Sequence, residues 1–110
     1  MKDAEIYRKS VNCFQAILKN SKLSKQVCIV NTFGLHARAA VQIAGIAQKA
    51  RSVVHISNHN LKADASSIID ILTLNGLQGS MLTFEIENSS DQNILDALVN
   101  LVENGFGEEN

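Results

Sequence analysis

The hydrophobic positions of the chain follow two periods, and each period predicts one kind of element. Apolar residues recur at every second position in three segments, as they do in half-buried β-strands: Val27 and Ile29, Val54 and Ile56, and Leu82, Phe84 and Ile86. A turn at 58–60 leads into a short returning segment at 61–63, which is typical of a hairpin. The pattern therefore predicts four short strands.

Helical spacing occurs in three further segments of the body of the chain. One helix is predicted to begin after His36, a short one covers 66–72, and the last follows Ser89, which forms a capping-box pattern with Gln92. Asn104-Gly105 is typical of a left-handed helix end. The predicted buried faces are Ala40, Ile43, Ala44 and Ala47 in the first helix, and Ile94, Leu98, Leu101 and Val102 in the last.

An N-terminal segment precedes this pattern. Four of its apolar residues recur at spacings of four, three and four, which predicts an amphipathic helix of roughly four turns. They are Tyr7, Val11, Phe14 and Leu18. Because such a helix is marginal alone in water, we expect it to pack on its own domain, on a second copy or on a partner. The chain thus divides into an extension with its connector at 1–24 and a domain at 25–110.

The order of elements after the extension predicts the fold. It reads strand, helix, strand, strand, helix, strand, helix. Since three helices cannot cover both faces of four short strands, they must share one face. We predict an α/β (α+β) open-faced two-layer sandwich, with a four-stranded, mainly antiparallel sheet, three helices on one face and the additional N-terminal helix.

Composition and charge exclude several classes of protein. The chain has 110 residues, 45% hydrophobic and 19% charged, which excludes a disordered tail or a fibrous repeat. No apolar run is long enough for a bilayer and the first residues lack a signal-peptide pattern, so we expect a cytoplasmic chain without membrane insertion. Residues 1–25 carry six basic and two acidic residues, whereas 26–110 carry four and nine. An acidic body without an aromatic and basic stripe argues against nucleic-acid binding.

One of the three histidines has a context that indicates chemistry. His36 follows a glycine-containing loop, directly precedes a helix, and is followed by Arg38. A helix N-terminus offers unpaired N–H groups to an anion, so a phosphoryl group on this imidazole would be held by backbone amides and by Arg38. The alternative is a histidine that only caps the helix. His55 and His59 are expected to be solvated, and no spacing of histidine and cysteine predicts a metal site.

The residues around His36 also form a known motif. The run Gly34-Leu35-His36-Ala37-Arg38-Ala39-Ala40 resembles the active-site signature of HPr, the histidine-containing phosphocarrier of the bacterial sugar phosphotransferase system, whose pattern is Gly-Leu-His-x-Arg-Pro-Ala. The resemblance continues through 63–69, 72–74 and 78–80, and it covers the chain from Lys25 to the C-terminus. The predicted order of strands and helices is also the HPr order.

The resemblance implies a role for individual residues. His36 would carry phosphate on Nδ1, and Arg38 would steady the phosphoryl group. Ser67 would be the regulatory serine that HPr kinase/phosphorylase modifies in bacteria that have that enzyme. The other implied residues are Gly34, Leu35, Ala37 and Ala39 around the phosphate, and Val41, Ile68, Ile69 and Leu72 as an apolar docking patch.

The resemblance further implies a stoichiometric carrier rather than a stand-alone enzyme. It would accept phosphate from enzyme I and pass it to a sugar-specific or regulatory acceptor, as a monomer and without cofactor or metal. Ala39 stands where the family has proline, and Gly45 and Gln48 stand where some relatives present lysines. Ala39 and the N-terminal extension leave two alternatives: a regulatory binding module that acts mainly through Ser67 and the docking patch, and a structural domain that oligomerises through its N-terminal helix.

Overall fold

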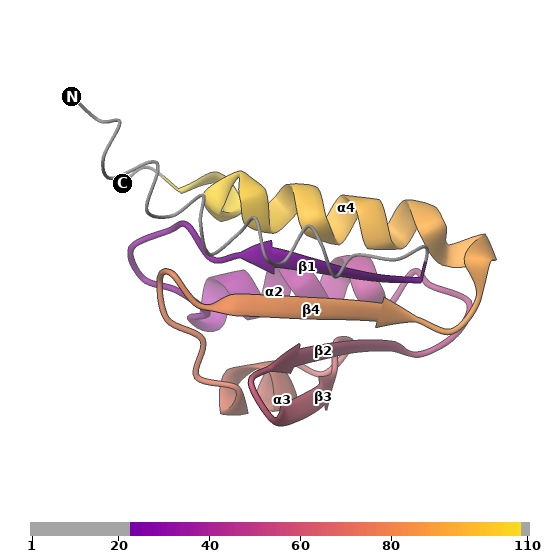
Figure 1. The fold of residues 1–110 in the computed structure, drawn as a ribbon, viewed down its shortest axis with the longest axis horizontal. Helices are drawn as coiled ribbons and strands as arrows, with labels where there is room; N and C mark the ends of the chain where they lie inside the picture. Colours follow the sequence, from indigo (N-terminus) through magenta and orange to yellow (C-terminus); the bar gives the residue numbers. More distant parts are fainter. Residues whose placement is uncertain (1–22, 109–110) are drawn as a thin grey trace.

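Four antiparallel strands form one sheet in the computed structural model, which describes residues 23–108. The strand order is β1-β4-β2-β3, and every neighbouring pair is antiparallel (Figure 1). The strands are β1 (Ser24–Cys28), β2 (Val54–Asn58), β3 (Leu61–Asp64) and β4 (Met81–Ile86). The predicted sheet of four short strands is confirmed.

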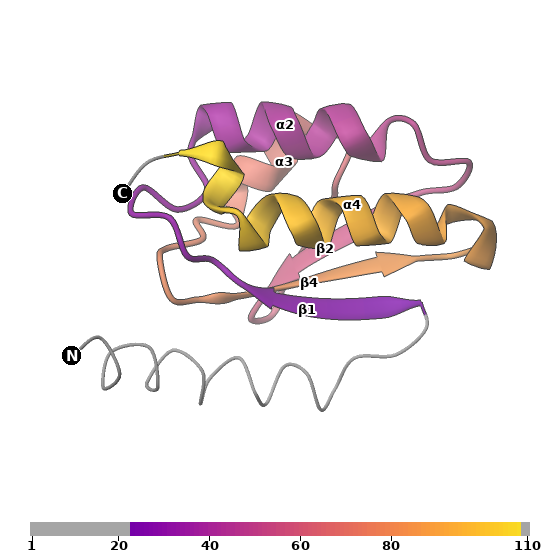
Figure 2. The same ribbon diagram turned by 90° about the horizontal axis from the view of Figure 1, so that it is seen from above.

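Three α-helices cover one face of this sheet, as Figure 2 shows. Within the described residues they are α2 (Ala37–Ala47), α3 (Ile68–Thr73) and α4 (Gln92–Glu103). The order of elements and the two-layer α+β sandwich agree with the prediction. The predicted N-terminal helix lies outside the described residues. No helix within 23–108 is long and apolar enough to cross a membrane.

The core lies between the sheet and the helices. It is made of the apolar residues that recur at strand and helix spacing in the sequence. Every second residue of β2 and β4 is buried, because successive side chains of a strand point to opposite faces. The predicted buried face of α2 is confirmed, and α2 packs against both α3 and α4. These core residues are Val54, Ile56, Leu82, Phe84 and Ile86 from the strands, and Ala39, Ala40, Ile43, Ala44 and Ala47 from α2.

The start of α3 differs from the predicted boundary. The helix predicted at 66–72 occupies Ile68–Thr73, and Ser67 is its N-cap. Ser66 stays outside the helix because its N–H and its hydroxyl both donate to Asp64 Oδ1, at 2.9 and 2.7 Å. Two polar groups of Ser66 are thereby bonded to a side chain rather than to the helix.

The capping box predicted for the last helix is wrong. Ser89 lies inside a 3₁₀ turn, η1 (Ser89–Asp91), and the cap of that turn is Asn88, whose Oδ1 accepts from Ser90 N–H at 3.0 Å. The buried face of α4 contains Leu95 beside Ile94, Leu98 and Val102, while Leu101 is only half-buried. The signal is misleading because Asn88 offers the same cap chemistry one residue earlier.

The end of α4 follows the prediction and then continues into a further turn. Gly105 has a φ of 64°, the left-handed conformation that a helix end of this kind uses. A second 3₁₀ turn, η2 (Gly105–Gly107), follows and buries Phe106 in the core. This turn determines where the last described residue, Glu108, is placed.

Candidate functional site

The loop before α2 is held in place by close backbone contact with a second loop. Gly34 has a φ of 64°, and a Cβ at this position would lie 2.3 Å from the carbonyl oxygen of Gly76. Leu35 N–H donates to the same carbonyl at 2.9 Å. Only glycine can adopt this backbone conformation and also allow this close approach. Gly34 therefore positions Leu35 and His36, the two residues that follow it in the loop before α2.

His36 is the N-cap of α2, and its ring takes part in the cap. Its Nδ1 accepts from Arg38 N–H at 3.2 Å, and its carbonyl accepts from Ala40 N–H at 2.9 Å. Because Nδ1 is an acceptor here, this geometry assigns the proton of a neutral ring to Nε2. The lone pair of Nδ1 therefore points toward the N-terminus of α2, where the helix carries partial positive charge.

The other ring nitrogen of His36 faces a carboxylate from the opposite end of the chain. Nε2 is in contact with Glu108 Oε2, and the second carboxylate oxygen accepts from Asn31 Nδ2 at 3.0 Å. Asn31 also donates to the carbonyl of Gly34 at 3.0 Å. Desolvation raises the pKa of Glu108, but the hydrogen bonds from Asn31 and His36 outweigh it, and the positive charge of Arg38 helps to hold the pKa below its ordinary value.

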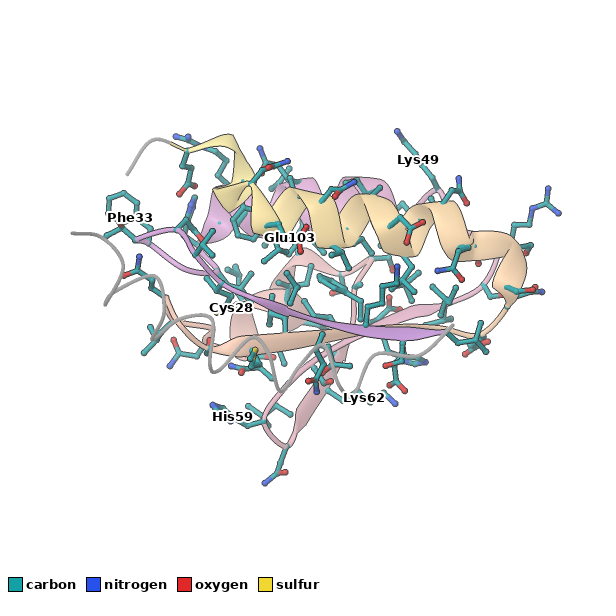
Figure 3. The ribbon with its side chains drawn as sticks, turned by 45° about the horizontal axis from the view of Figure 1, so that its top comes forward. Cys28, Phe33, Lys49, His59, Lys62 and Glu103 are labelled. Atoms are coloured by element: carbon teal, nitrogen blue, oxygen red, sulfur yellow. The ribbon has the colours of Figure 1, made fainter. Side chains whose placement is uncertain are left out.

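An open hollow surrounds the ring of His36. Its lining comes from the loop before α2, from α2 itself and from the C-terminal turn: Phe33, His36, Arg38, Gly107 and Glu108. The ring of Phe33 stands edge-to-face to the imidazole, with centroids 6.1 Å apart and an interplanar angle of 88°. Figure 3 shows Phe33 at the end of the fold where this loop turns into α2. The arrangement places a half-buried imidazole beside a helix N-terminus, where backbone N–H groups are suited to an anion.

Comparison with known proteins identifies the family of this chain. Residues 23–104 match the family model described as the PTS HPr component phosphorylation site. The chain belongs to the HPr family. Its domain is 36% identical over 86 residues to the phosphocarrier protein HPr of Cupriavidus necator, covering 78% of this chain and 97% of that protein. It is 34% identical over 86 residues to the phosphocarrier protein NPr of Proteus mirabilis, covering 77% and 96%.

Solved HPr structures have the same fold. The crystal structure of HPr-C-His from Thermoanaerobacter tengcongensis superposes with a TM-score of 0.74 at 34% identity, covering 79% of this chain and 98% of that one. The phosphocarrier protein HPr from Bacillus anthracis gives a TM-score of 0.68 at 30% identity, covering 73% and 95%. The chain is therefore a member of a family of phosphocarriers of the phosphotransferase system.

The structure brings most of the predicted HPr site residues together. Arg38 is exposed at the first turn of α2, beside His36, and Ala37 is exposed next to it. Leu35 and Ala39 are buried and support the loop and the helix from below. Two residues that lie beside His36, Asn31 and Glu108, are not predicted from the sequence because they lie outside the motif. One signal for Glu108 is the Gly-Phe-Gly run that precedes it, which predicts a turn after α4.

Ser67, the predicted regulatory serine, lies at the N-terminus of α3. The hydroxyl of Ser67 accepts from Asp70 N–H at 3.3 Å as the N-cap of α3. The predicted patch lies beside it on α3 and on α2, which pack against each other. Its members are exposed to different degrees: Val41 52%, Ile68 38%, Ile69 74% and Leu72 38%.

The other histidines are separate from this site. His55 Nε2 lies 3.4 Å from Glu87 Oε2, and His59 is exposed in the turn between β2 and β3. Figure 3 places His59 and Lys62 on the side of the sheet away from the helices. Within residues 23–108, no three His, Cys, Asp or Glu side chains are grouped so that they could hold a metal ion.

Proposed function

We propose that this HPr-family chain carries its phosphoryl group on Nδ1 of His36. The observation that supports this most strongly is the cap geometry: Nδ1 accepts from Arg38 N–H, so its lone pair is directed at the positive end of α2. A phosphoryl group bonded there would meet backbone N–H groups and the guanidinium of Arg38. Both stabilise negative charge on phosphate oxygens.

The transfer is an in-line displacement at phosphorus. Nδ1 donates its lone pair and forms the N–P bond, while the bond from phosphorus to the donor breaks and its electron pair stays on the donor. Donor and acceptor proteins provide the opposite side of the reaction. This chain contributes a fixed nucleophile and preorganised positive charge, which are the main requirements of phosphoryl transfer.

The partners in this proposal are enzyme I as donor and a sugar-specific or regulatory component as acceptor, and the chain works as a cytoplasmic monomer. The apolar patch of α2 and α3 is the proposed docking surface, because Ile69 and Val41 are exposed beside the site-bearing helix. The division at 1–24 and 25–110 belongs to the same proposal. Sedimentation of the full chain against a chain that begins at Leu23 tests the monomer, and a dimer formed only by the full chain would favour the oligomerising alternative.

The shortened chain keeps Leu23 and Ser24, although the proposed domain boundary lies after residue 24, because both residues make contacts in the sheet. The carbonyl of Leu23 accepts from Ile86 N–H at 2.9 Å, and Ser24 pairs with Glu85. Removing these residues would shorten β1 and confuse loss of oligomerisation with loss of folding.

The experiment that tests the carrier function is phosphoenolpyruvate-dependent labelling by enzyme I from the source organism. Intact mass is measured before and after mild acid. We expect the gain of one phosphate, which acid removes and which His36→Ala abolishes. His55→Ala and His59→Ala are matched controls that should label like the parent chain. Labelling that persists in His36→Ala would place the phosphate on another residue.

A second candidate function rests on Ser67. Its hydroxyl lies at the N-cap of α3, beside the exposed Ile68 and Ile69, so a phosphate there would change the charge of the proposed docking surface. In this alternative the chain acts mainly as a regulatory binding module. Unlabelled but well-folded protein in the enzyme I assay, together with modification of Ser67 by an HPr kinase, would favour it.

A further inference from the structure

The C-terminal turn is built to deliver one side chain to His36. Phe106 is buried in the core although its φ of 59° is unusual for a residue other than glycine. Gly107 N–H donates to Asn104 O at 3.2 Å, and Glu108 N–H donates to Gly105 O at 3.0 Å. The backbone of Glu108 is thus anchored by a buried aromatic residue and by consecutive hydrogen bonds.

The carboxylate of Glu108 is held at both oxygens. Oε1 accepts from Asn31, and Oε2 contacts Nε2 of His36. Only 9% of the Glu108 side chain is exposed, and Asn31 is completely buried. Because Asn31 also bonds Gly34 O, the loop before α2 and the C-terminal turn share one rigid polar link.

We propose that Glu108 is a positioning residue for phosphoryl transfer, an inference that rests on the proposed role of His36. Glu108 accepts from Nε2–H, while Arg38 N–H donates to Nδ1, so both ring nitrogens have opposite and complementary partners. This pairing holds the ring in the tautomer that keeps the proton on Nε2 and the lone pair on Nδ1. It also fixes the plane of the ring against rotation about its bond to Cβ.

The carboxylate also compensates a charge that the reaction creates. When Nδ1 bonds to phosphorus, Nε2 keeps its proton and the ring becomes formally cationic. No proton has to leave, and the donor keeps the electron pair of the broken bond. Glu108 lies against the edge of the ring that carries Nε2, so its negative charge stabilises this cation while Arg38 and the helix amides neutralise the phosphoryl oxygens at Nδ1. The same pairing of carboxylate and imidazole supports histidine in other nucleophilic sites.

The first measurement is the tautomer of His36 in the unphosphorylated protein, by ¹⁵N NMR of the ring at a pH where the ring is neutral. The parent chain should show the Nε2–H form. Glu108→Gln has one accepting oxygen for the two donors, Asn31 and His36, and should weaken the preference for this form, whereas Glu108→Ala should give a mixture of both tautomers. Glu103→Gln, an exposed change of the same charge on α4, is the matched control. An unchanged spectrum in Glu108→Ala would overturn the positioning role.

The second measurement is the rate of phosphoryl acceptance from phosphorylated enzyme I. Loss of a charge-assisted hydrogen bond at a partly exposed ring should slow acceptance about tenfold in Glu108→Gln and by more in Glu108→Ala, with Glu103→Gln unchanged. Equal rates in all variants would overturn the charge compensation. If the parent chain accepts no phosphate, the proposed function fails, whereas the tautomer measurement still decides the role of Glu108.

Discussion

Asn31 and Glu108 are joined by a hydrogen bond of 3.0 Å although 77 positions separate them in the sequence. The bond connects the loop that precedes α2 with the turn that follows α4. Because Asn31 also donates to Gly34 O, it links the backbone that places His36 with the side chain that contacts the His36 ring.

Asn31→Ala should therefore destabilise the domain and loosen its site together. The substitution leaves the carbonyl of Gly34 and the Oε1 of Glu108 without this donor in a buried environment, which costs about 1–3 kcal/mol. Denaturant unfolding measures the loss, and the ¹⁵N spectrum of His36 measures the loosening. Asn93→Ala, at an exposed position of α4, should leave both unchanged within about 0.5 kcal/mol. Equal stability of the two variants would contradict the link.

Two glycine substitutions should have opposite effects. Gly34→Ala forces a Cβ into the carbonyl of Gly76 at a positive φ, so we expect a loss of about 1–3 kcal/mol and slower phosphate acceptance. Gly45→Ala adds a Cβ inside α2, where nothing lies within 4 Å, and should stabilise by about 0.5–1 kcal/mol. Thermal unfolding of both variants is the measurement. A neutral Gly34→Ala would mean that this loop relaxes without cost.

Substitutions at Ser67 should separate stability from docking. Ser67→Ala removes the N-cap of α3 and should cost about 0.5–2 kcal/mol. Ser67→Asp keeps a capping carboxylate and should retain stability, while its added charge weakens binding to enzyme I. Calorimetric titration with enzyme I tests the second effect, and Asn60→Asp, in the exposed turn between β2 and β3, is the control for a charge added away from the proposed docking surface. Unchanged binding of Ser67→Asp would argue against a regulatory serine.

The sequence predicts most of the fold because its signals are local. Alternation and helical spacing locate the four strands and three helices, and the run around His36 locates the proposed nucleophile. Of the four apolar residues of α3, Ile68, Ile69, Ile71 and Leu72, only Ile71 is buried, because a helix this short cannot turn all of them inward. Helix starts are less predictable: Asn88 and Ser89 offer similar cap chemistry, and the choice depends on packing.

The remaining half of the site could not be predicted, because it depends on contacts between distant segments. Nothing near Asn31 in the sequence indicates that its amide will meet Glu108. The contact exists only because β1 and α4 are adjacent in the fold and because Phe106 fixes the turn after α4. Residue spacing predicts which side chains are neighbours along one helix or strand. It contains no information on a contact between two distant segments, such as the one between Asn31 and Glu108.

A pair of isoleucines on α3 should distinguish docking from folding. Ile69 is 74% exposed and Ile71 is fully buried. Ile69→Ala should change the free energy of unfolding by no more than about 0.5 kcal/mol and weaken binding to enzyme I. Ile71→Ala should cost about 2–5 kcal/mol through the cavity it leaves. Denaturant unfolding and titration with enzyme I together check both. Full binding by Ile69→Ala would remove this residue from the docking surface.

Asp64 should contribute to the loss of stability in acid. Hydrogen bonds from the hydroxyl and then the N–H of Ser66 lower its pKa, burial opposes them, and the charge of His55 lowers it slightly further. A carboxyl whose pKa is lower in the folded protein stabilises the folded state above the unfolded pKa of about 3.9, and this contribution disappears as the pH falls through the folded pKa.

Asp64→Asn should therefore be less stable than the parent at about pH 6, by less than about 1 kcal/mol because the group is partly exposed, and the difference should shrink at about pH 3. Urea unfolding at both pH values is the measurement, with Ser66→Ala and the double variant completing a cycle. A difference that stays constant with pH would show that the Ser66 contacts stabilise the turn without favouring the charged carboxylate.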